Sequence, residues 1–423
     1  MSLAWRAYRI AAPAIGALAP AAGLFSPSDE RPVWGERLGR VRVEGACEAW
    51  IHAASLGEAT AVGPLARELD SLRPGAALHL SATTVTGRAR LAALAQKREA
   101  PTSVSLAPLD APQAVRRFIA GVRPARVLLV ETELWPHWLL AAREARVAVA
   151  VVSARLSERS VVGYRRLGRA FASLVAGLGA VLCQAAADRE RWLAIGVRPE
   201  HTLVTGNLKH DALPAPAGDR AAARGALGLD PARPLLVLGS LRPGEVALLA
   251  RAWRALPAAL RSAWQVAAVP RHPRASDELA REAVDAGLTL VRGEVPVEGA
   301  WAWDARAGVL LSYYAAADAA FVGGSLGPYG GHNPLEPAAC GAAVLMGPHH
   351  AAQADGVRAL RTRDAVWIAS STQDLALGLR TLLGDPAARA ARTAAGLEVV
   401  EGLRGVAART VAELARLGLW PPR

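Results

Sequence analysis

Short apolar runs alternate with amphipathic stretches along most of the chain, and this alternation restricts the fold more than any other feature. Between the runs, the apolar spacing predicts helices at 59–72 and 87–96, and a mostly helical ending from 373 to 416. A βαβα alternation predicts α/β domains, each with a parallel sheet covered by helices on both faces. The predicted strands are 49–53, 78–81, 127–130, 147–152, 180–182, 234–238, 264–269, 288–291, 319–322 and 343–346.

The length and one breaker-rich segment predict two such domains. A chain of 423 residues exceeds the roughly 100–200 residues of a typical domain. The segment Leu-Pro-Ala-Pro-Ala-Gly-Asp at 213–219 separates two periodic regions, so we interpret it as a linker. We therefore expect Rossmann-like, doubly wound domains at 46–212 and 220–423. Ligands bind at the carboxyl ends of the strands in such sheets, and we expect these ends to face a shared cleft.

Residues 1–45 are predicted to form a separate segment that contacts a membrane. Arg6 and Arg9 precede an uncharged stretch from 10 to 25, which is shorter than the roughly 20 residues of a spanning helix. We favour an amphipathic or shallowly inserted segment. A cleaved signal peptide with a site at 17–19 is one alternative, and a helix packed on the core is another.

The net charge limits the kinds of partner that we expect, and the cysteines limit the metal sites and the compartment. A net charge of +12 favours anionic partners, although a solvated arginine-rich surface explains the same count. No basic tail and no basic cluster interleaved with aromatic residues is present, so nucleic acid is not an expected partner. Cys47, Cys183 and Cys340 match neither a zinc site nor a disulfide framework. We expect free buried thiols in a reducing compartment, and no metal and no cofactor.

Three polar positions follow predicted strands in the first half. Glu58, in Ser-Leu-Gly-Glu at 55–58, lies at a strand-to-helix turn, where it suits a general base or simply complements the helix dipole. Glu131 is the first residue after the run 127–130, and a catalytic role competes there with helix capping. Lys209 ends Thr-Gly-Asn-Leu-Lys at 205–209, after the short apolar run 203–204, and suits a phosphate or a carboxylate, unless it is only a surface lysine.

Three turns in the second half follow strands in the same way. The loop at 239–245 has glycines suited to a close approach of phosphate, but it lacks a dinucleotide or Walker spacing. Arg271 follows the run 264–269 and suits a phosphate, with a solvated turn as the alternative. The strongest signal is the paired-glycine segment 323–337, which contains Gly-Gly-His-Asn-Pro-Leu-Glu-Pro. Glycines and free helix N–H groups there suit an anion.

Together these motifs resemble the 3-deoxy-D-manno-octulosonic acid (Kdo) transferases of lipopolysaccharide synthesis. The resemblance runs from about residue 50 to residue 348, and the motifs occur in the family's order. The chain departs from the family at Val309, where an acidic residue is usual, and at Ser-Leu-Arg in 240–242, where Ser-Thr-His is common. The matching segments are 8–9, 36–39, 55–58, 131–136, 154–157, 206–209 with Asp211, 270–273, 323–337 and 347–348.

The resemblance implies a GT-B fold and an inverting glycosyltransferase at the cytoplasmic face of the inner membrane. It implies transfer of Kdo from cytidine monophosphate-Kdo (CMP-Kdo) to a tetra-acylated lipid A precursor, lipid IVA. Glu58 would be the base, and Glu131 and Lys209 would stabilise the transition state. The implied CMP contacts are Pro270, Arg271, Gly308, Val309, Leu310, Asn333, Pro334, Leu335 and Glu336.

Two other functions remain open from the residues alone. The same fold serves UDP-sugar transferases or epimerases, which a preference for uridine over cytidine nucleotides would reveal. The positive charge alone is also compatible with a non-catalytic protein that binds anionic lipid or nucleic acid. Salt-dependent DNA binding without nucleotide affinity would identify that function.

Overall fold

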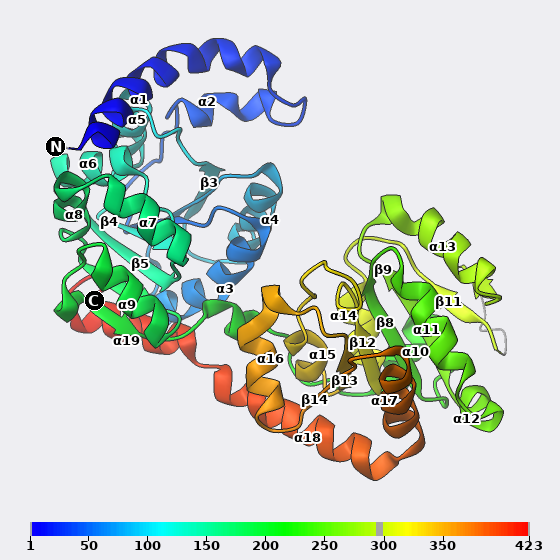
Figure 1. The fold of residues 1–423 in the computed structure, drawn as a ribbon. Coiled ribbons are helices and arrows are strands. Elements are labelled where there is room, and N and C mark those ends of the chain that lie inside the picture. The colour runs from blue at the N-terminus through cyan, green and yellow to red at the C-terminus, as the bar shows by residue number, and fades with distance from the viewer. Residues whose placement is uncertain (1, 293–298, 422–423) are drawn as a thin grey trace. The chain divides into compact units, whose positions relative to one another are not determined.

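The computed structural model describes residues 2–292 and 299–421, and it divides the chain into two compact units. The first unit is Met1–Ala212 together with Leu403–Arg423, and the second is Leu213–Gly402. Each unit contains one parallel sheet with helices on both faces (Figure 1). The segment 213–219 forms neither helix nor strand, and the boundary between the units falls at its start.

The first sheet has seven parallel strands in the order β3-β2-β1-β4-β5-β6-β7. The central strands β4 and β5 are buried after their first residue, because helices cover both sides, and they are accordingly rich in Val, Leu and Ala. The strands are β1 (Ala49–His52), β2 (Leu78–Ala82), β3 (Thr102–Leu106), β4 (Arg126–Val130), β5 (Ala148–Ala154), β6 (Ala180–Cys183) and β7 (Thr202–Val204).

Two apolar cores lie on the two faces of this sheet. One is formed mainly with α1, α5, α6, α8 and α9, and the other with α3, α4 and α19. The helices are α1 (Leu3–Ala22), α2 (Trp34–Arg37), α3 (Leu56–Leu72), α4 (Val85–Ala95), α5 (Pro112–Val122), α6 (Pro136–Glu144), α7 (Glu158–Arg166), α8 (Arg169–Val175), α9 (Ala186–Ala194) and α19 (Val406–Arg416), with 3-10 turns η1 (Gly23–Phe25), η2 (Arg31–Val33), η3 (Pro199–His201) and η4 (Leu208–Ala212).

The second sheet repeats the arrangement with seven parallel strands in the order β10-β11-β9-β8-β12-β13-β14. Its strands are β8 (Leu235–Leu241), β9 (Gln265–Pro270), β10 (Leu290–Val291), β11 (Trp301–Trp303), β12 (Ala319–Val322), β13 (Ala343–Met346) and β14 (Val366–Ile368). Its helices are α10 (Arg220–Ala226), α11 (Glu245–Arg254), α12 (Ala258–Ala263), α13 (Ser276–Asp285), α14 (Leu310–Ala316), α15 (Leu335–Ala339), α16 (Ala354–Arg361), α17 (Thr372–Gly384) and α18 (Pro386–Leu403), with η5 (Pro273–Ala275) and η6 (Ala351–Gln353).

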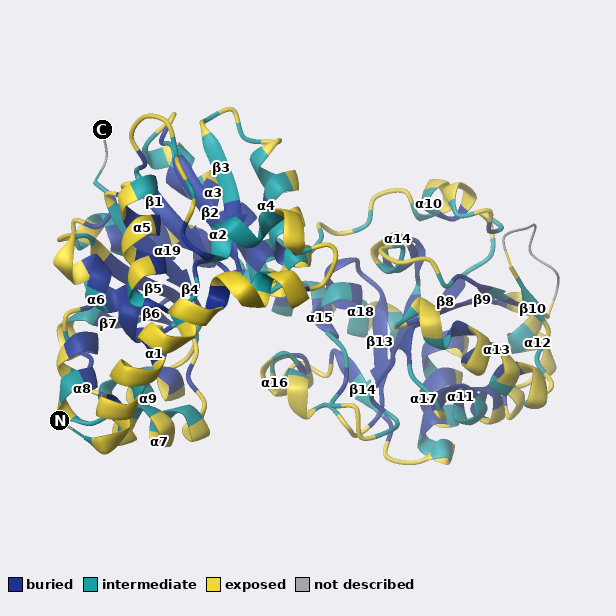
Figure 2. Ribbon diagram, turned by 90° about the horizontal axis from the view of Figure 1, so that it is seen from above, coloured by how far each residue is buried: buried dark blue, intermediate teal, exposed yellow. Residues whose placement is uncertain are grey.

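The predicted α/β class is confirmed, and each predicted apolar run forms a strand in the structure. Strands β3, β11 and β14 were not predicted, and β7 was noted only as a short apolar run. These four lie at or next to sheet edges, and β7, β11 and β14 have only three residues each. Figure 2 shows the buried sheets in dark blue and the exposed outer helix faces in yellow.

The strand order creates one switch point in each sheet. The order reverses between β1 and β4 in the first unit and between β8 and β12 in the second. The loops that leave neighbouring strands at such a point diverge to opposite faces, and ligands bind in the crevice between them. Residues that follow β1, β4, β8 and β12 are therefore the first candidates for a site.

The predicted domain 220–423 differs from the structure at its C-terminal end. Leu403–Arg423 belongs to the first unit, so the chain returns to the unit where it began. The reason is the apolar face of α19, which is buried with α3 in the first unit's core, including Val411 and Leu414. Trp420 follows α19, is fully buried, and donates from Nε1 to the Leu69 carbonyl at 3.2 Å.

The N-terminal helix is longer than the sequence pattern predicted. The apolar stretch was taken to start at residue 10, but α1 begins at Leu3 and continues through η1, so the helical segment Leu3–Phe25 has 23 residues. That length and its mean hydropathy of 1.2 suffice for a membrane span. Trp5, Ala12 and Ala19 form a buried seam. The other faces carry exposed apolar side chains, and α1 is largely yellow in Figure 2.

Substitution of Trp420 by Ala tests whether the C-terminal segment supports the first unit. We expect Trp420→Ala to lower the free energy of unfolding of that unit by about 3–5 kcal/mol, the usual cost of removing a large buried aromatic side chain. Hydrogen exchange should show the lost protection in the first unit's strands. Trp301→Ala is the matched control, because Trp301 is equally buried in the second unit. Loss of protection in the second unit after Trp420→Ala would contradict the assignment.

Candidate active site

Glu58 lies at the first switch point and both of its carboxylate oxygens are held. It is in the first turn of α3, just after β1. The backbone N–H of Ala54 donates to Oε2 at 2.7 Å, and the Ser55 hydroxyl donates to Oε1 at 2.9 Å. Ser55 is the N-cap of α3, and its hydroxyl in turn accepts from the Glu58 N–H at 3.4 Å. The carboxylate is thus fixed at the rim of the sheet.

The environment of Glu58 favours proton uptake. Burial raises the pKa of its carboxyl above the usual value, and the negative charges of Glu131 and Glu133 raise it further. Hydrogen bonds from Ser55 and Ala54 oppose the shift without cancelling it. A carboxylate with a raised pKa is a stronger base, so this position suits general-base chemistry.

Glu131 and Lys209 meet beside Glu58. Glu131 follows β4 with a left-handed φ of 63°, an unusual conformation for a residue with a side chain. Its Oε1 lies 2.5 Å from Nζ of Lys209. A Cβ added at Gly57 would lie 3.9 Å from the same Nζ, so Lys209 passes directly over the residue before Glu58. The structure therefore brings together the three predicted catalytic positions.

The turn that carries Lys209 is anchored on both sides. Ser153, at the end of β5, accepts from the N–H of Leu208 at 3.1 Å through its hydroxyl. The Asn207 side chain accepts from the Lys209 N–H at 3.0 Å. Asp211 accepts from the N–H of Ala407 at 2.5 Å, which ties the turn to the start of α19. These bonds hold the lysine backbone while its side chain remains partly exposed, at 41%.

Two further polar residues at this rim were not predicted as site residues. Glu133 is two residues beyond Glu131, and its Oε2 lies 3.5 Å from Nε2 of His52, the last residue of β1. The Trp135 indole N–H donates to Glu133 at 2.6 Å. The second carboxylate of Glu-Thr-Glu was the available sequence signal. The link to His52 was not visible, because it depends on the pairing of β1 with β4.

In the second unit, Arg271 and Glu336 lie near one another at the carboxyl ends of the strands. Pro270 ends β9, and the N–H of Arg271 donates to the Leu241 carbonyl at 3.1 Å. The Asn333 side chain bridges the start of α15, accepting from the Leu335 N–H at 3.1 Å and donating to Glu336 at 3.3 Å. Burial raises the pKa of Glu336, although Asn333 and the charge of Arg271 oppose the shift.

The predicted contacts Gly308, Val309 and Leu310 also lie near the second switch point. Gly308 has a φ of 84°, Val309 is the residue before α14, and Leu310 begins that helix. A Cβ added at Gly239 in β8 would lie 2.9 Å from a Leu310 methyl group. The start of α14 therefore packs on the end of the strand that precedes Arg242.

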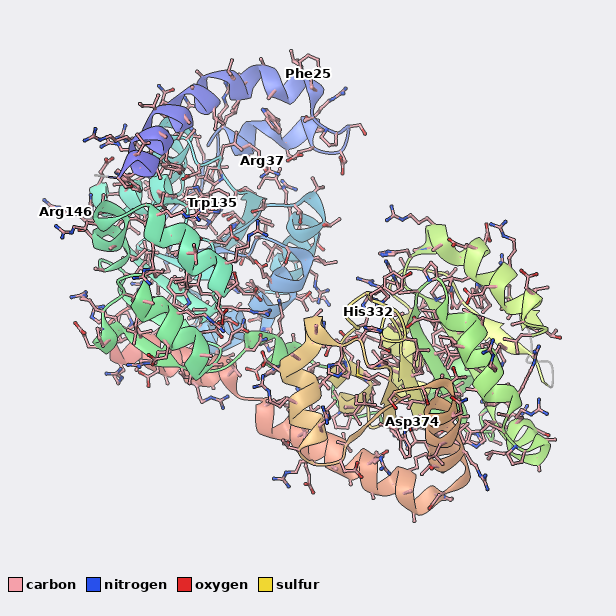
Figure 3. All side chains as sticks on the ribbon, in the orientation of Figure 1. Phe25, Arg37, Trp135, Arg146, His332 and Asp374 are labelled. Atoms are coloured by element: carbon pink, nitrogen blue, oxygen red, sulfur yellow. The ribbon has the colours of Figure 1, made fainter. Side chains whose placement is uncertain are left out.

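The glycine-rich segment folds back on itself after β12. The N–H of Gly331 donates to the Gly324 carbonyl at 2.7 Å, and that of His332 donates to the Gly323 carbonyl at 3.1 Å. Figure 3 labels His332 among the loops of this unit. Burial and the positive charges of Arg271, Arg242 and His272 lower the pKa of His332 to about 4. A base surrounded by cations in this way marks a region of positive potential that favours anions.

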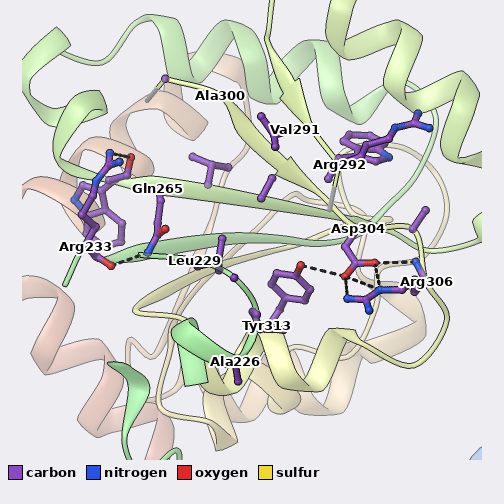
Figure 4. Close-up of a pocket in the computed structure, with 18 of the residues that line it drawn as sticks. Ala226, Leu229, Arg233, Gln265, Val291, Arg292, Ala300, Asp304, Arg306 and Tyr313 are labelled. Atoms are coloured by element: carbon purple, nitrogen blue, oxygen red, sulfur yellow. Dashed lines mark hydrogen bonds and ion pairs between the residues drawn. The ribbon is translucent and has the colours of Figure 1, made fainter. Parts of the chain in front are cut away.

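A pocket of about 970 Å³ in the second unit lies apart from these residues (Figure 4). Asp304, Arg306 and Tyr313 line it, and both Arg306 and the Tyr313 hydroxyl donate to the Asp304 carboxylate. None of the predicted CMP contacts lines this pocket. The predicted contacts instead surround the ends of β8, β9 and β12. Across the described ranges 2–292 and 299–421, no group of three or more His, Cys, Asp or Glu side chains is arranged to hold a metal ion.

Known proteins resemble this chain in sequence and in fold. Residues 33–212 match the family model described as 3-deoxy-D-manno-octulosonic-acid transferase (kdotransferase). The 3-deoxy-D-manno-octulosonic acid transferase of Bordetella pertussis is 37% identical over 92% of this chain and 90% of its own length. The 3-deoxy-D-manno-octulosonic acid transferase of Haemophilus influenzae is 30% identical over 85% of this chain and 84% of its own length. The UDP-GlcNAc 2-epimerase of Neisseria meningitidis, 14% identical, superposes with a TM-score of 0.60 over 87% of this chain and 100% of its own. That likeness concerns the fold alone, which is GT-B.

The charge of Glu131 should control the pKa of Glu58. We expect Glu131→Gln to lower the Glu58 pKa, because the variant removes the neighbouring negative charge that contributes most to raising it. Glu133→Gln should shift it in the same direction but less, since Glu133 contributes least. Carboxyl ¹³C titration of glutamate-labelled protein measures both, with Glu58→Gln identifying the signal. An unchanged Glu58 pKa in Glu131→Gln would contradict the proximity of the two carboxylates.

Proposed function

Because the chain belongs to the Kdo transferase family, it is a glycosyltransferase of lipopolysaccharide synthesis, and we propose that it moves Kdo from CMP-Kdo to lipid IVA with inversion and release of CMP. The observation that carries the proposal is the cluster at the first switch point. There, a carboxyl with a raised pKa lies beside a lysine that is paired at 2.5 Å with a second carboxylate. Such a cluster combines a base with a fixed positive charge.

The proposed reaction is a single displacement. Glu58 accepts the proton of an acceptor hydroxyl as the hydroxyl oxygen bonds to the anomeric carbon of Kdo. The bond from that carbon to the phosphate oxygen breaks, and the bonding electrons leave with CMP. One displacement at one carbon inverts its configuration. Only one base is needed, and a positioned base contributes on the order of 10²–10⁴-fold to the rate.

Lys209 and Glu131 are proposed to stabilise the transition state. Lys209 supplies a positive charge where negative charge develops, and Glu131 holds its ammonium group in place. Glu131 also raises the pKa of Glu58. The same carboxylate thus makes the base stronger and orients the lysine.

The second unit is proposed to bind the CMP part of the donor. Pro270, Arg271, the loop at 308–310 and the segment 333–336 surround the second switch point, where burial and then the nearby positive charges lower the pKa of His332. Cations bind a phosphate, and this edge carries the positive charges of Arg271 and Arg242. The residue at 309 is valine, so any contact at that position is made through the backbone.

The first segment is proposed to hold the enzyme at the cytoplasmic face of the inner membrane, where its lipid acceptor lies. Helix α1 exposes Ile10, Leu18 and, in the following turn, Phe25, whose side chain is 87% exposed (Figure 3). Arg6 and Arg9 are exposed near its start and suit an anionic lipid surface. Three buried free cysteines agree with a reducing compartment. Nucleic acid is not a proposed partner.

The function is tested with the full-length chain, CMP-Kdo and lipid IVA in detergent micelles. The wild type should form a Kdo-lipid product, whose mass also gives the number of Kdo residues added. Glu58→Gln should lower kcat by about 10²–10⁴-fold, because the variant cannot accept the proton. Glu68→Gln, on the same helix, is the matched control and should retain activity. A wild type that forms no product, or full activity in Glu58→Gln, would refute the proposal.

Membrane association is tested by flotation with phosphatidylglycerol-containing vesicles. The double variant Leu18→Glu and Phe25→Glu should remain in the unbound fraction, because charged side chains cannot enter the acyl region without a large cost. It should retain its activity on micellar acceptor. Leu377→Glu changes a comparably exposed leucine of α17 and should float like the wild type. Flotation of the double variant to the wild-type extent would exclude α1 as the membrane contact.

A further inference from the structure

A buried carboxylate joins the two loops at the second switch point. Glu245, only 1% exposed, accepts from the N–H of Arg242 at 2.9 Å in the loop after β8. It also accepts from three consecutive N–H groups of the loop after β12, at 2.8 to 2.9 Å. Those donors are Gly324, Ser325 and Leu326. A buried charge is retained at low cost only when it is fully hydrogen-bonded, and here the bonds hold two loops together.

Arg242 is the side chain that this arrangement orients. Its guanidinium carbon lies 4.5 Å from the centre of the Tyr329 ring, and the Tyr329 hydroxyl donates to the Pro243 carbonyl at 3.2 Å. The ring therefore crosses from the glycine-rich loop to the loop of Arg242. Stacking on an aromatic face leaves the edge of a guanidinium available for planar anions.

Arg242 is not neutralised by the protein. Its Nε–H is buried and has no hydrogen-bond partner among the described residues, and none of the described carboxylates forms an ion pair with it. The positive charge of Arg242 nevertheless acts on two histidines from different segments. It contributes to lowering the pKa of His332 and that of His272, in each case after burial and the charge of Arg271. Three loops thus share one region of positive potential.

We infer that Arg242 is a further donor-binding residue, which binds an oxyanion of CMP-Kdo, and that Glu245 is the positioning residue that holds it. The inference rests on the proposed function. The donor has two sources of oxyanions, the phosphate and the sugar carboxylate, and a guanidinium fork binds either through paired N–H bonds. The position carries arginine where the resembling family often has histidine, so this chain offers a permanent charge at that point.

The test compares Arg242→Gln with wild type in two measurements on the full-length enzyme, the KM for CMP-Kdo and the Kd for CMP. We expect the donor KM to rise about 10- to 100-fold, as for loss of a charge-assisted hydrogen bond. An unchanged Kd for CMP would assign Arg242 to the sugar carboxylate, which CMP lacks. A parallel rise in both would assign it to the phosphate. An unchanged donor KM would overturn the inference.

Arg274→Gln is the matched control, because Arg274 is an exposed neighbour that also contributes to the field at His272. It should change the donor KM little, so that a general loss of positive charge is distinguished from loss of a specific contact. Arg242→Lys should recover only part of the affinity, since an ammonium lacks the planar fork. A wild type without transfer from CMP-Kdo would refute the proposed function instead, before any variant is compared.

Glu245→Gln tests the positioning role. The amide nitrogen cannot accept a hydrogen bond, so some of the four N–H groups lose their partner and the two loops loosen. We expect a higher donor KM with a smaller change in kcat, together with a lower melting temperature. A lower melting temperature with an unchanged donor KM would show that Glu245 serves stability alone and would overturn its positioning role.

Discussion

Burial of both faces of a parallel sheet is the constraint on which the rest of this structure depends. Strands that are covered by helices on both sides are apolar along their length, so polar chemistry is possible only where they end. Both sheets follow this rule, and both have site residues directly after the strands that meet at a switch point. Glu58 and Glu131 follow β1 and β4, and Arg242 and Gly323 follow β8 and β12.

The sequence sufficed to predict where these residues lie, because strand ends can be located from apolar runs alone. It did not suffice to predict which side chains pair. The ion pair of Glu131 with Lys209 joins segments separated by two further strands of the sheet, β5 and β6. The same holds for Glu245, which reads as an ordinary acidic residue in a first helical turn. Its role depends on N–H groups that follow a different strand.

The ends of the chain were predicted less well, also for a physical reason. An amphipathic helix such as α19 shows in its sequence that one face is buried, but not against which sheet. Its apolar side chains pack with α3 in the first unit, far from it in the sequence. The extent of α1 was underestimated because the arginines near its start were taken to end the apolar stretch. A helix tolerates them, since long basic side chains extend away from an apolar surface.

Residues with a strained, left-handed backbone conformation occur both before the strands and at their carboxyl ends. Among the residues that the structure describes, six other than glycine have a left-handed φ. Arg123, Arg146 and Asp364 follow helices and precede strands, where such a turn commonly ends a helix. Glu131, Ser153 and Ser240 instead lie at the carboxyl ends of β4, β5 and β8.

Each of the latter three costs on the order of 1–2 kcal/mol relative to an ordinary conformation, and at Glu131 and Ser153 a specific contact offsets part of that cost. Glu131 pairs with Lys209, and Ser153 holds the turn that carries the lysine. At Ser240 the backbone approaches so closely that a Cβ at Gly323 would lie 2.5 Å from the Ser240 carbonyl oxygen. That close approach brings the loop of Arg242 against the glycine-rich loop. At the carboxyl ends of the strands, the strained turns are therefore the ones that bring the site residues together.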